Sequence, residues 1–338
     1  MAAYTAIDDP TLYFSATLYT GDGANDRAVT VAGTGMQPDM VWIKWRSVGE
    51  GHVLGDAVRG VNRKLVPNDT DAESSGSSYT NISTITSTGF TLSATGGGVD
   101  DAVIKDTATY VAWCWKETAT AGFDIVAYTG NGSNRTIAHS LSAVPKMIFV
   151  KTRDATSSWQ VYHESMGNTK FLELNTTTAQ QDEANRWQDT TPTSSVFSIG
   201  DDAAMNEDGT TYISYLFSEK QGFSKFGSYE GNGNAEGPFV YTGFRPAYIV
   251  TKAIDTTSNW YIFDNKRPAD SNPCHDYVKA NANAAEDTDD ADVGLDFLSN
   301  GFKLRGDNAV VNGVETYVYI AFAESPFVNS NGVPGNAR

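Results

Sequence analysis

One pattern occurs three times along this chain of 338 residues, and it limits the possible folds more than any other feature. Each copy opens with a short apolar segment that ends in a Gly-Asx-Gly turn. Glycine adopts positive φ without strain and Asn or Asp tolerates it, so a tight turn is expected. The three segments are 14–23, 123–132 and 223–233, starting at Phe14, Phe123 and Phe223. Self-similarity of this kind indicates a repeat architecture.

A proline followed by a lysine six residues later marks the next segment of each copy. The pairs are Pro38 and Lys44, Pro145 and Lys151, and Pro246 and Lys252. We expect each proline to be the first residue of a strand, where its missing N–H costs no hydrogen bond. Another expected strand starts fourteen residues after each proline, at His52, Trp159 and Trp260. It ends at Asp56, His163 and Asp264, which we interpret as polar, solvated strand ends.

An aromatic strand closes each copy, over residues 110–115, 212–217 and 317–322. The spacing of these strands predicts an N-terminal arm (1–11), three β-modules (12–117, 122–219 and 222–325) and a C-terminal tail (326–338). Short strands between turns favour an all-β fold of three tandem, pseudo-repeated, β-sandwich-like modules. A ring with three-fold pseudosymmetry, such as a β-prism or propeller, is the alternative, because three repeats can also close on themselves.

No residue pattern points to catalysis, so we expect no catalytic residue, no cofactor and no enzymatic activity. The four histidines lack metal-ligand spacing, and no Gly-x-Ser-x-Gly or Walker motif occurs. The two cysteines, Cys114 and Cys274, are too few for a disulfide framework and too far apart for a metal site. The acidic stretches, such as 286–292, do not match an EF-hand, and loosely bound Ca²⁺ stays open as an alternative.

Two groups of apolar residues are candidate contact sites. Trp159, Trp187 and Trp260 are candidates for stacking on a glycan or a protein partner. The alternative for Trp159 and Trp260 is that they cap the core of their own modules. Phe327 and Val328 lie beyond the last expected strand and are candidate assembly contacts. Their alternative is a tail that folds back on its own module.

The net charge of −17 argues against a nucleic-acid partner, because an acidic surface repels phosphates. No stretch approaches the roughly 18 apolar residues of a membrane span, so we expect no membrane insertion. The first ten residues have neither the basic nor the apolar segment of a signal peptide, which predicts synthesis in a cytoplasm.

The repeated motifs resemble those of virion structural and tail-fibre proteins of marine bacteriophages. The matching segments include 123–132, 139–151, 237–246 and 322–327. The resemblance implies a virion structural protein that is synthesised in the cytoplasm of the host bacterium. It implies a tail-fibre or tail-associated position with possible contacts to host surface glycans and to other virion proteins. It also points to a homo-oligomer, with a trimer favoured. The alternatives are a capsid decoration protein and, from another class, a polysaccharide depolymerase.

Overall fold

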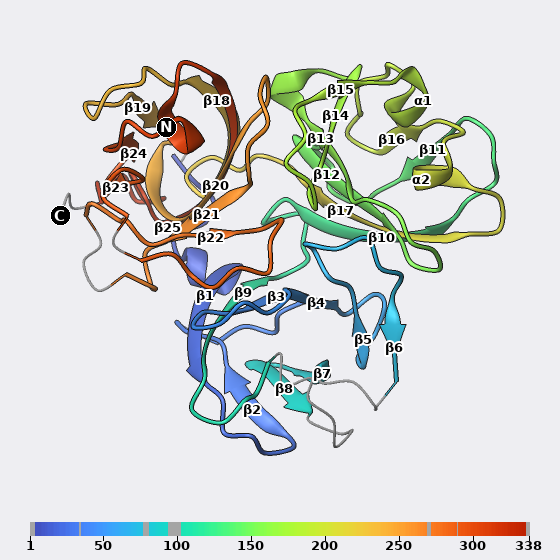
Figure 1. Cartoon of the computed structure of the whole chain (residues 1–338), viewed down its shortest axis with the longest axis horizontal. Coiled ribbons are helices and arrows are strands. Elements are labelled where there is room, and N and C mark those ends of the chain that lie inside the picture. The colour runs from blue at the N-terminus through green and yellow to red at the C-terminus, as the bar shows by residue number, and fades with distance from the viewer. Residues whose placement is uncertain are drawn as a thin grey trace.

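The computed structural model describes residues 4–33, 35–76, 81–93, 103–268, 272–288 and 290–335. Within these residues the chain is almost entirely β, which confirms the all-β prediction. Figure 1 shows three lobes that surround a common centre. Lobe 1 contains strands β1 to β9, lobe 2 contains β10 to β17, and lobe 3 contains β18 to β25.

Lobe 1 follows the 3₁₀ turn η1 (Pro10–Leu12) and is built on a four-stranded antiparallel sheet in the order β1-β9-β3-β4. A three-stranded sheet, β2-β8-β7, and the hairpin β5-β6 complete it. The strands are β1 (Phe14–Thr20), β2 (Arg27–Thr30), β3 (Met40–Trp45), β4 (Val53–Asp56), β5 (Arg63–Lys64), β6 (Ser74–Ser75), β7 (Asn81–Thr86), β8 (Gly89–Ser93) and β9 (Thr109–Trp115).

Lobe 2 has a main sheet in the order β10-β17-β12-β13-β14-β15 and a second sheet, β11-β16. Its strands are β10 (Phe123–Thr129), β11 (Arg135–Ala138), β12 (Met147–Thr152), β13 (Gln160–His163), β14 (Lys170–Glu173), β15 (Gln181–Asp182), β16 (Val196–Ile199) and β17 (Thr211–Phe217). Its short helices are η2 (Glu164–Met166), α1 (Ala184–Trp187) and α2 (Ala203–Asn206).

Lobe 3 has a main sheet in the order β18-β25-β20-β21-β22 and a second sheet, β19-β24-β23. Its strands are β18 (Ser224–Glu230), β19 (Phe239–Tyr241), β20 (Phe244–Ala253), β21 (Tyr261–Asp264), β22 (Val278–Lys279), β23 (Leu295–Leu298), β24 (Gly301–Leu304) and β25 (Thr316–Pro326). The helix α3 (Ala309–Asn312) precedes β25.

The three main sheets share one pattern of strand pairing. In each, the aromatic strand (β9, β17 or β25) lies between the opening strand and the lysine strand. The lysines pair in the same register, Lys44 with Val111, Lys151 with Ile213, and Lys252 with Val318. A stacked tyrosine pair joins the opening strand to the aromatic strand in each lobe, with ring centroids 4.9, 5.1 and 5.0 Å apart in lobes 1, 2 and 3. The exact module limits and the descent of the lobes from one repeated unit stay predictions.

The prolines do not occupy the expected first position of a strand. Pro38 and Pro145 precede β3 and β12, which begin at Met40 and Met147. Pro246 instead lies inside β20, where the ladder with β25 shifts its register on both sides of the proline. The register shift accommodates a residue that has no N–H to donate.

The centre of the molecule is an aromatic cluster that all three lobes build together. Trp115, Phe217 and Phe322, the last aromatic residues of β9, β17 and β25, contact one another. Their ring centroids are 6.5 Å apart for Trp115–Phe217, 5.8 Å for Trp115–Phe322 and 5.9 Å for Phe217–Phe322. A cavity of about 20 Å³ beside them is lined by apolar side chains, which suits no ligand larger than a water molecule. The lobes therefore form a closed ring around one core rather than a row (Figure 1).

Candidate functional site

The three candidate tryptophans lie in the interior. Trp159 is 0% exposed, Trp187 is 2% exposed and Trp260 is 1% exposed. An indole ring must present a face to solvent before a sugar can stack on it. The prediction that these residues contact a glycan is therefore wrong for the folded chain.

Trp159 and Trp260 instead join neighbouring lobes. We name the contacts the 1/2, 2/3 and 3/1 interfaces after the lobes that meet there. Trp159 Nε1 donates to Val66 O across the 1/2 interface, and Trp260 Nε1 donates to Glu173 O across the 2/3 interface, both at 3.1 Å. His52 holds the same position in lobe 1, and its Nε2 lies 3.1 Å from Lys279 O of lobe 3. One position of the pattern thus closes all three interfaces, and these side chains do more than cap their own lobes.

The three lysines of the pattern are also interface residues, and each is 0% exposed. The Lys44, Lys151 and Lys252 ammonium groups donate to the carbonyl of the next residue, at 2.6, 3.0 and 2.6 Å. Each also reaches a carbonyl of a neighbouring lobe: Asn283 O at 3.5 Å, Thr70 O at 3.1 Å and Thr177 O at 3.4 Å, respectively. Burial lowers the pKa of each of these ammonium groups to about 8.

The polar residues that end β4, β13 and β21 are buried, although the sequence predicted that they would be solvated. Asp56 is 2% exposed, and His163 and Asp264 are each 0% exposed. The reason is that each points into an interface. Tyr215 OH donates to Asp56 at 2.6 Å, and Trp113 Nε1 donates to Asp264 at 3.0 Å. His163 Nε2 lies 3.2 Å from Tyr319 O.

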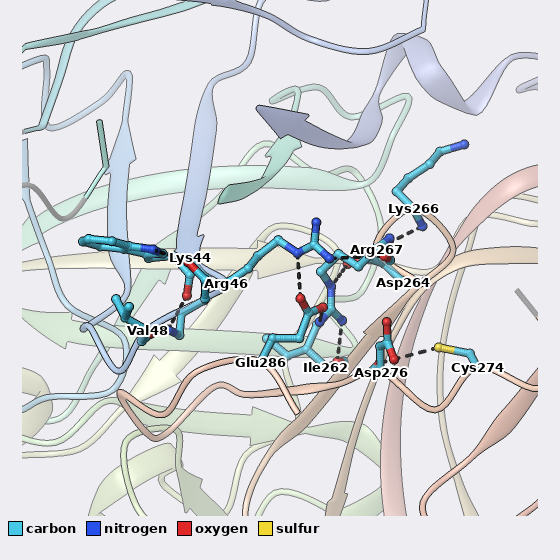
Figure 2. Close-up of polar contacts among 12 residues, drawn as sticks. Lys44, Arg46, Val48, Ile262, Asp264, Lys266, Arg267, Cys274, Asp276 and Glu286 are labelled. Atoms are coloured by element: carbon cyan, nitrogen blue, oxygen red, sulfur yellow. Dashed lines mark hydrogen bonds and ion pairs between the residues drawn. The ribbon is translucent and has the colours of Figure 1, made fainter. Parts of the chain in front are cut away.

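The 1/2 and 3/1 interfaces contain buried ion pairs. Glu73 accepts hydrogen bonds from Arg153 across the 1/2 interface, at 3.0 Å on each oxygen, and from Arg59 at 3.1 Å. Burial opposes ionisation of Glu73, but the arginines outweigh it and lower its pKa to about 2. Figure 2 shows the corresponding group at the 3/1 interface, where Glu286 lies between Arg46 and Arg267 with both contacts at 2.7 Å.

The 2/3 interface has the same backbone contact without the ion pairs, and we call it the neutral interface for that reason. The backbone N–H of Gln180 donates to Ile254 O at 2.7 Å, as that of Glu73 does to Arg153 O at 2.7 Å and that of Glu286 to Arg46 O at 2.8 Å. Neutral residues thus stand where the other interfaces have charged or hydrogen-bonding ones. Gln180 takes the place of Glu73 and Glu286, and His163 takes the place of Asp56 and Asp264. Ile254 takes the place of Arg153 and Arg46, and Met166 that of Arg59 and Arg267. Ile320 takes the place of Trp113 and Tyr215.

Residues 9–326 match the family described as a domain of unknown function, DUF7483. The chain belongs to the DUF7483 family. None of the curated proteins compared with it matches. The matched range covers all three lobes, so the ring of interfaces belongs to the family domain.

The tail residues of this DUF7483 chain lie against lobe 3. β25 runs to Pro326, one residue past the expected module limit. Phe327 N–H donates to Gly243 O at 3.3 Å, and Ser330 bonds Asp8 of the N-terminal arm. Phe327 and Val328 are half-buried by these contacts. Their role as assembly contacts stays a prediction, and residues 1–3 of the arm and 336–338 of the tail lie outside the described residues.

Two exposed aromatic residues were not found by sequence reasoning. Phe239 and Tyr241 of β19 are 47% and 53% exposed. These two residues differ from their equivalents only when β19 is aligned by register with β2 and β11, which have small residues at the same positions.

The described residues contain no group of three or more His, Cys, Asp and Glu side chains that could hold a metal ion. Among the helices in the described part of the chain, none is long and apolar enough to cross a membrane. Both cysteines are buried, and burial raises the pKa of their thiols. The expectations of no cofactor and no catalysis stay predictions, and loosely bound Ca²⁺ stays an alternative.

Proposed function

We propose that this chain is a non-enzymatic structural protein of a bacteriophage particle. The observation that carries the proposal is the closure of the ring. Each lobe is held on two sides by buried side-chain contacts and at the centre by a shared aromatic cluster. A body with no free lobe resists deformation, which suits a component of an assembled particle. The resemblance to virion structural and tail-fibre proteins supports the same role.

The chemistry of the buried histidines supports a structural rather than a catalytic role. A general acid or base works best with a pKa near the operating pH. Burial lowers the pKa of His52 to about 3 and that of His163 to about 4. Both side chains are occupied by hydrogen bonds at interfaces. We expect a polysaccharide depolymerase assay of the full chain to show no activity, and hydrolysis that is lost in a folded His163→Ala variant would overturn this part of the proposal.

The position in the particle is either the tail, as the resemblance implies, or the capsid surface. The three-lobed outline, viewed down the shortest axis in Figure 1, favours a cap or plate over a segment of a long shaft. This shape is the reason to keep capsid decoration as a second candidate. The proposed homo-oligomer, a trimer in the first instance, would have to use outer surfaces, because the equivalent interface faces of the lobes are used inside one chain.

Mass spectrometry of purified particles tests the proposal directly. Particles are separated into heads and tails, and peptides of this chain are quantified against the major capsid protein. We expect the chain in the particle at a fixed ratio, with the fraction that contains it deciding between tail and head. Its absence from purified particles, together with its presence in infected cells, would contradict the proposal.

A further inference from the structure

The strand β19 carries an aromatic pair on its outer face. Phe239 and Tyr241 stand two residues apart and point to the same side, while Val240 between them is buried. The Phe239 ring lies over Gly301 of β24, where an added Cβ would come within 2.9 Å of it. The backbone glycine thus supports one side of the ring and leaves the rest of it at the surface.

The other two lobes show that the fold does not need these rings. Register pairing aligns Phe239 with Ala28 of β2 and Thr136 of β11. It aligns Tyr241 with Thr30 and Ala138. All four of these residues are exposed, and their lobes keep the same sheet pairing. The same sheet pairing therefore forms in lobes 1 and 2 without the aromatic pair.

Hydrogen-bonding groups flank the pair on one side. Lys303 pairs across the strands with Phe239, and its ammonium group bonds Glu236 at 2.9 Å. Glu236 is largely exposed, with 75% of its side chain accessible. The backbone of Lys303 therefore lies one strand spacing from that of Phe239, and its side chain is on the same face of the sheet.

A hollow of about 280 Å³ adjoins Tyr241. Tyr4 of the N-terminal arm enters it, with its hydroxyl 3.3 Å from Tyr241 OH and 2.9 Å from Gly243 O. Its wall carries the Glu219–Lys225 ion pair, 2.8 Å long. The hollow combines aromatic, hydroxyl, carboxylate and ammonium groups in one open depression.

We propose that this surface binds a saccharide, with sugar rings stacked on Phe239 and Tyr241 and sugar hydroxyls bonded in the hollow. A sugar ring has an apolar C–H face and an edge of hydroxyls, and the surface offers a counterpart to each. A protein of standard interface size would need about 800 Å² of contact on each side, far more than two rings supply. The proposal rests on the proposed function only for the source of the saccharide, which would be the surface of the host cell.

A binding test on the full chain uses three soluble probes of different charge: maltohexaose, an alginate hexamer and chitohexaose. Binding is measured by saturation-transfer NMR and calorimetry. The double variant Phe239→Thr with Tyr241→Ala gives β19 the residues of β11 and should fold normally. Val314→Thr, at a position of lobe 3 that is 81% exposed, is the matched control.

We expect at least one probe to bind, with an affinity reduced at least tenfold in the double variant and unchanged in the control. Both variants should melt at the parent temperature. The inference is overturned if no probe binds, or if the double variant binds as the parent does. A particle-borne chain without saccharide binding would refute this inference alone, whereas a saccharide-binding chain absent from particles would refute the proposed function alone.

Discussion

The 1/2 and 2/3 interfaces share the same hydrogen-bond geometry, but only the 1/2 interface has buried ion pairs. Both have the tryptophan contact, the lysine contact and the backbone hydrogen bond from the residue at position 73 or 180. The first adds a buried network of Arg59, Asp56 and Glu73. The second has Met166, His163 and Gln180 at the corresponding positions. The backbone, Trp and Lys contacts are therefore enough to form the 2/3 interface without an ion-pair network.

This difference predicts which interfaces lose the most stability when one residue is replaced. A buried ion pair gains little over well-packed apolar residues, but removing one of its members leaves an uncompensated charge. We therefore expect the ion-paired interfaces to respond strongly to single substitutions and to acid. The neutral 2/3 interface should respond less to substitution, and its response to acid should begin at a higher pH than that of Glu73 at the 1/2 interface.

The largest effect is expected for Asp264→Asn at the 3/1 interface. The amide keeps one acceptor oxygen, so its NH2 would face either Arg267 Nε and Trp113 Nε1, which donate to Asp264 Oδ2 at 2.6 and 3.0 Å, or the two backbone N–H groups that donate to Oδ1. We expect the free energy of unfolding in urea to fall by about 3–5 kcal/mol. His163→Asn, the corresponding change at the neutral interface, should cost about 1–3 kcal/mol.

Asp182→Asn is the control for these variants, because Asp182 forms an exposed pair with Lys170 and its loss should cost less than about 0.5 kcal/mol. Equal losses for Asp264→Asn and His163→Asn would remove the distinction between the interfaces.

The pH dependence should separate the interfaces by their titrating groups. Burial lowers the pKa of His163 from 6.5 to about 4, so the unfolded chain binds more protons between these values. The free energy of unfolding should then fall as the pH drops from 6.5 to 4, by up to about 3 kcal/mol from His163. A His163→Gln variant should show a flatter profile in this window, with the contribution of His52 remaining.

Glu73 should act at lower pH. Its pKa is lowered from 4.5 to about 2, so its stabilisation is complete above 4.5 and is lost as the pH falls toward 2. Glu73→Gln should flatten only this lower window in urea unfolding followed by circular dichroism. The comparison fails if each variant changes the window assigned to the other.

A charge pair can be installed at the neutral interface. Gln180→Glu with Ile254→Arg copies Glu73 and Arg153 onto a site with the same backbone hydrogen bond. Each single variant should lose stability, because it introduces a charge without its counterpart. The double variant should recover to within about 1 kcal/mol of the parent, with a coupling energy of about 1–3 kcal/mol in a double-mutant cycle. A coupling energy near zero would show that the two positions do not meet as they do at the 1/2 interface.

The smallest effect on stability is expected from the tail. Deleting residues 327–338 removes the Phe327 and Ser330 contacts but leaves β25 intact. The melting temperature should fall by only about 1–2 °C, which corresponds to about 1 kcal/mol or less for a chain of this length. If the tail is an assembly element, light scattering will show loss of the oligomer. An unchanged oligomer would refute the assembly role of Phe327 and Val328.

The strands were predictable from sequence, and the ring contacts were not. The residue patterns of the aromatic segments and of the lysine segments both indicate strands. The aromatic segments form β9, β17 and β25, and the lysine segments form β3, β12 and β20 beside them. Trp159 was expected as the first residue of a strand, and it lies one residue before β13. Its hydrogen-bond acceptor, Val66 O, is 93 residues away, and no local pattern specifies such an acceptor.

The same limit explains why Asp56 and His163 were expected at the surface. A polar residue at a strand end usually meets water, and only the packing of a second lobe reverses that expectation. Tyr241 was missed for the opposite reason, since an aromatic residue in a strand is usually buried.

Native-state hydrogen exchange tests most directly whether the three lobes form one cooperative unit. The central strands β9, β17 and β25 each belong to a different lobe and meet at the shared aromatic cluster. If the interfaces couple the lobes, the slowest amides of these strands will exchange with the same free energy of opening, within about 1 kcal/mol, and with the same dependence on urea. A β9 that opens at a much lower free energy than β17 and β25 would contradict this account, because lobe 1 would then unfold while lobes 2 and 3 stay intact.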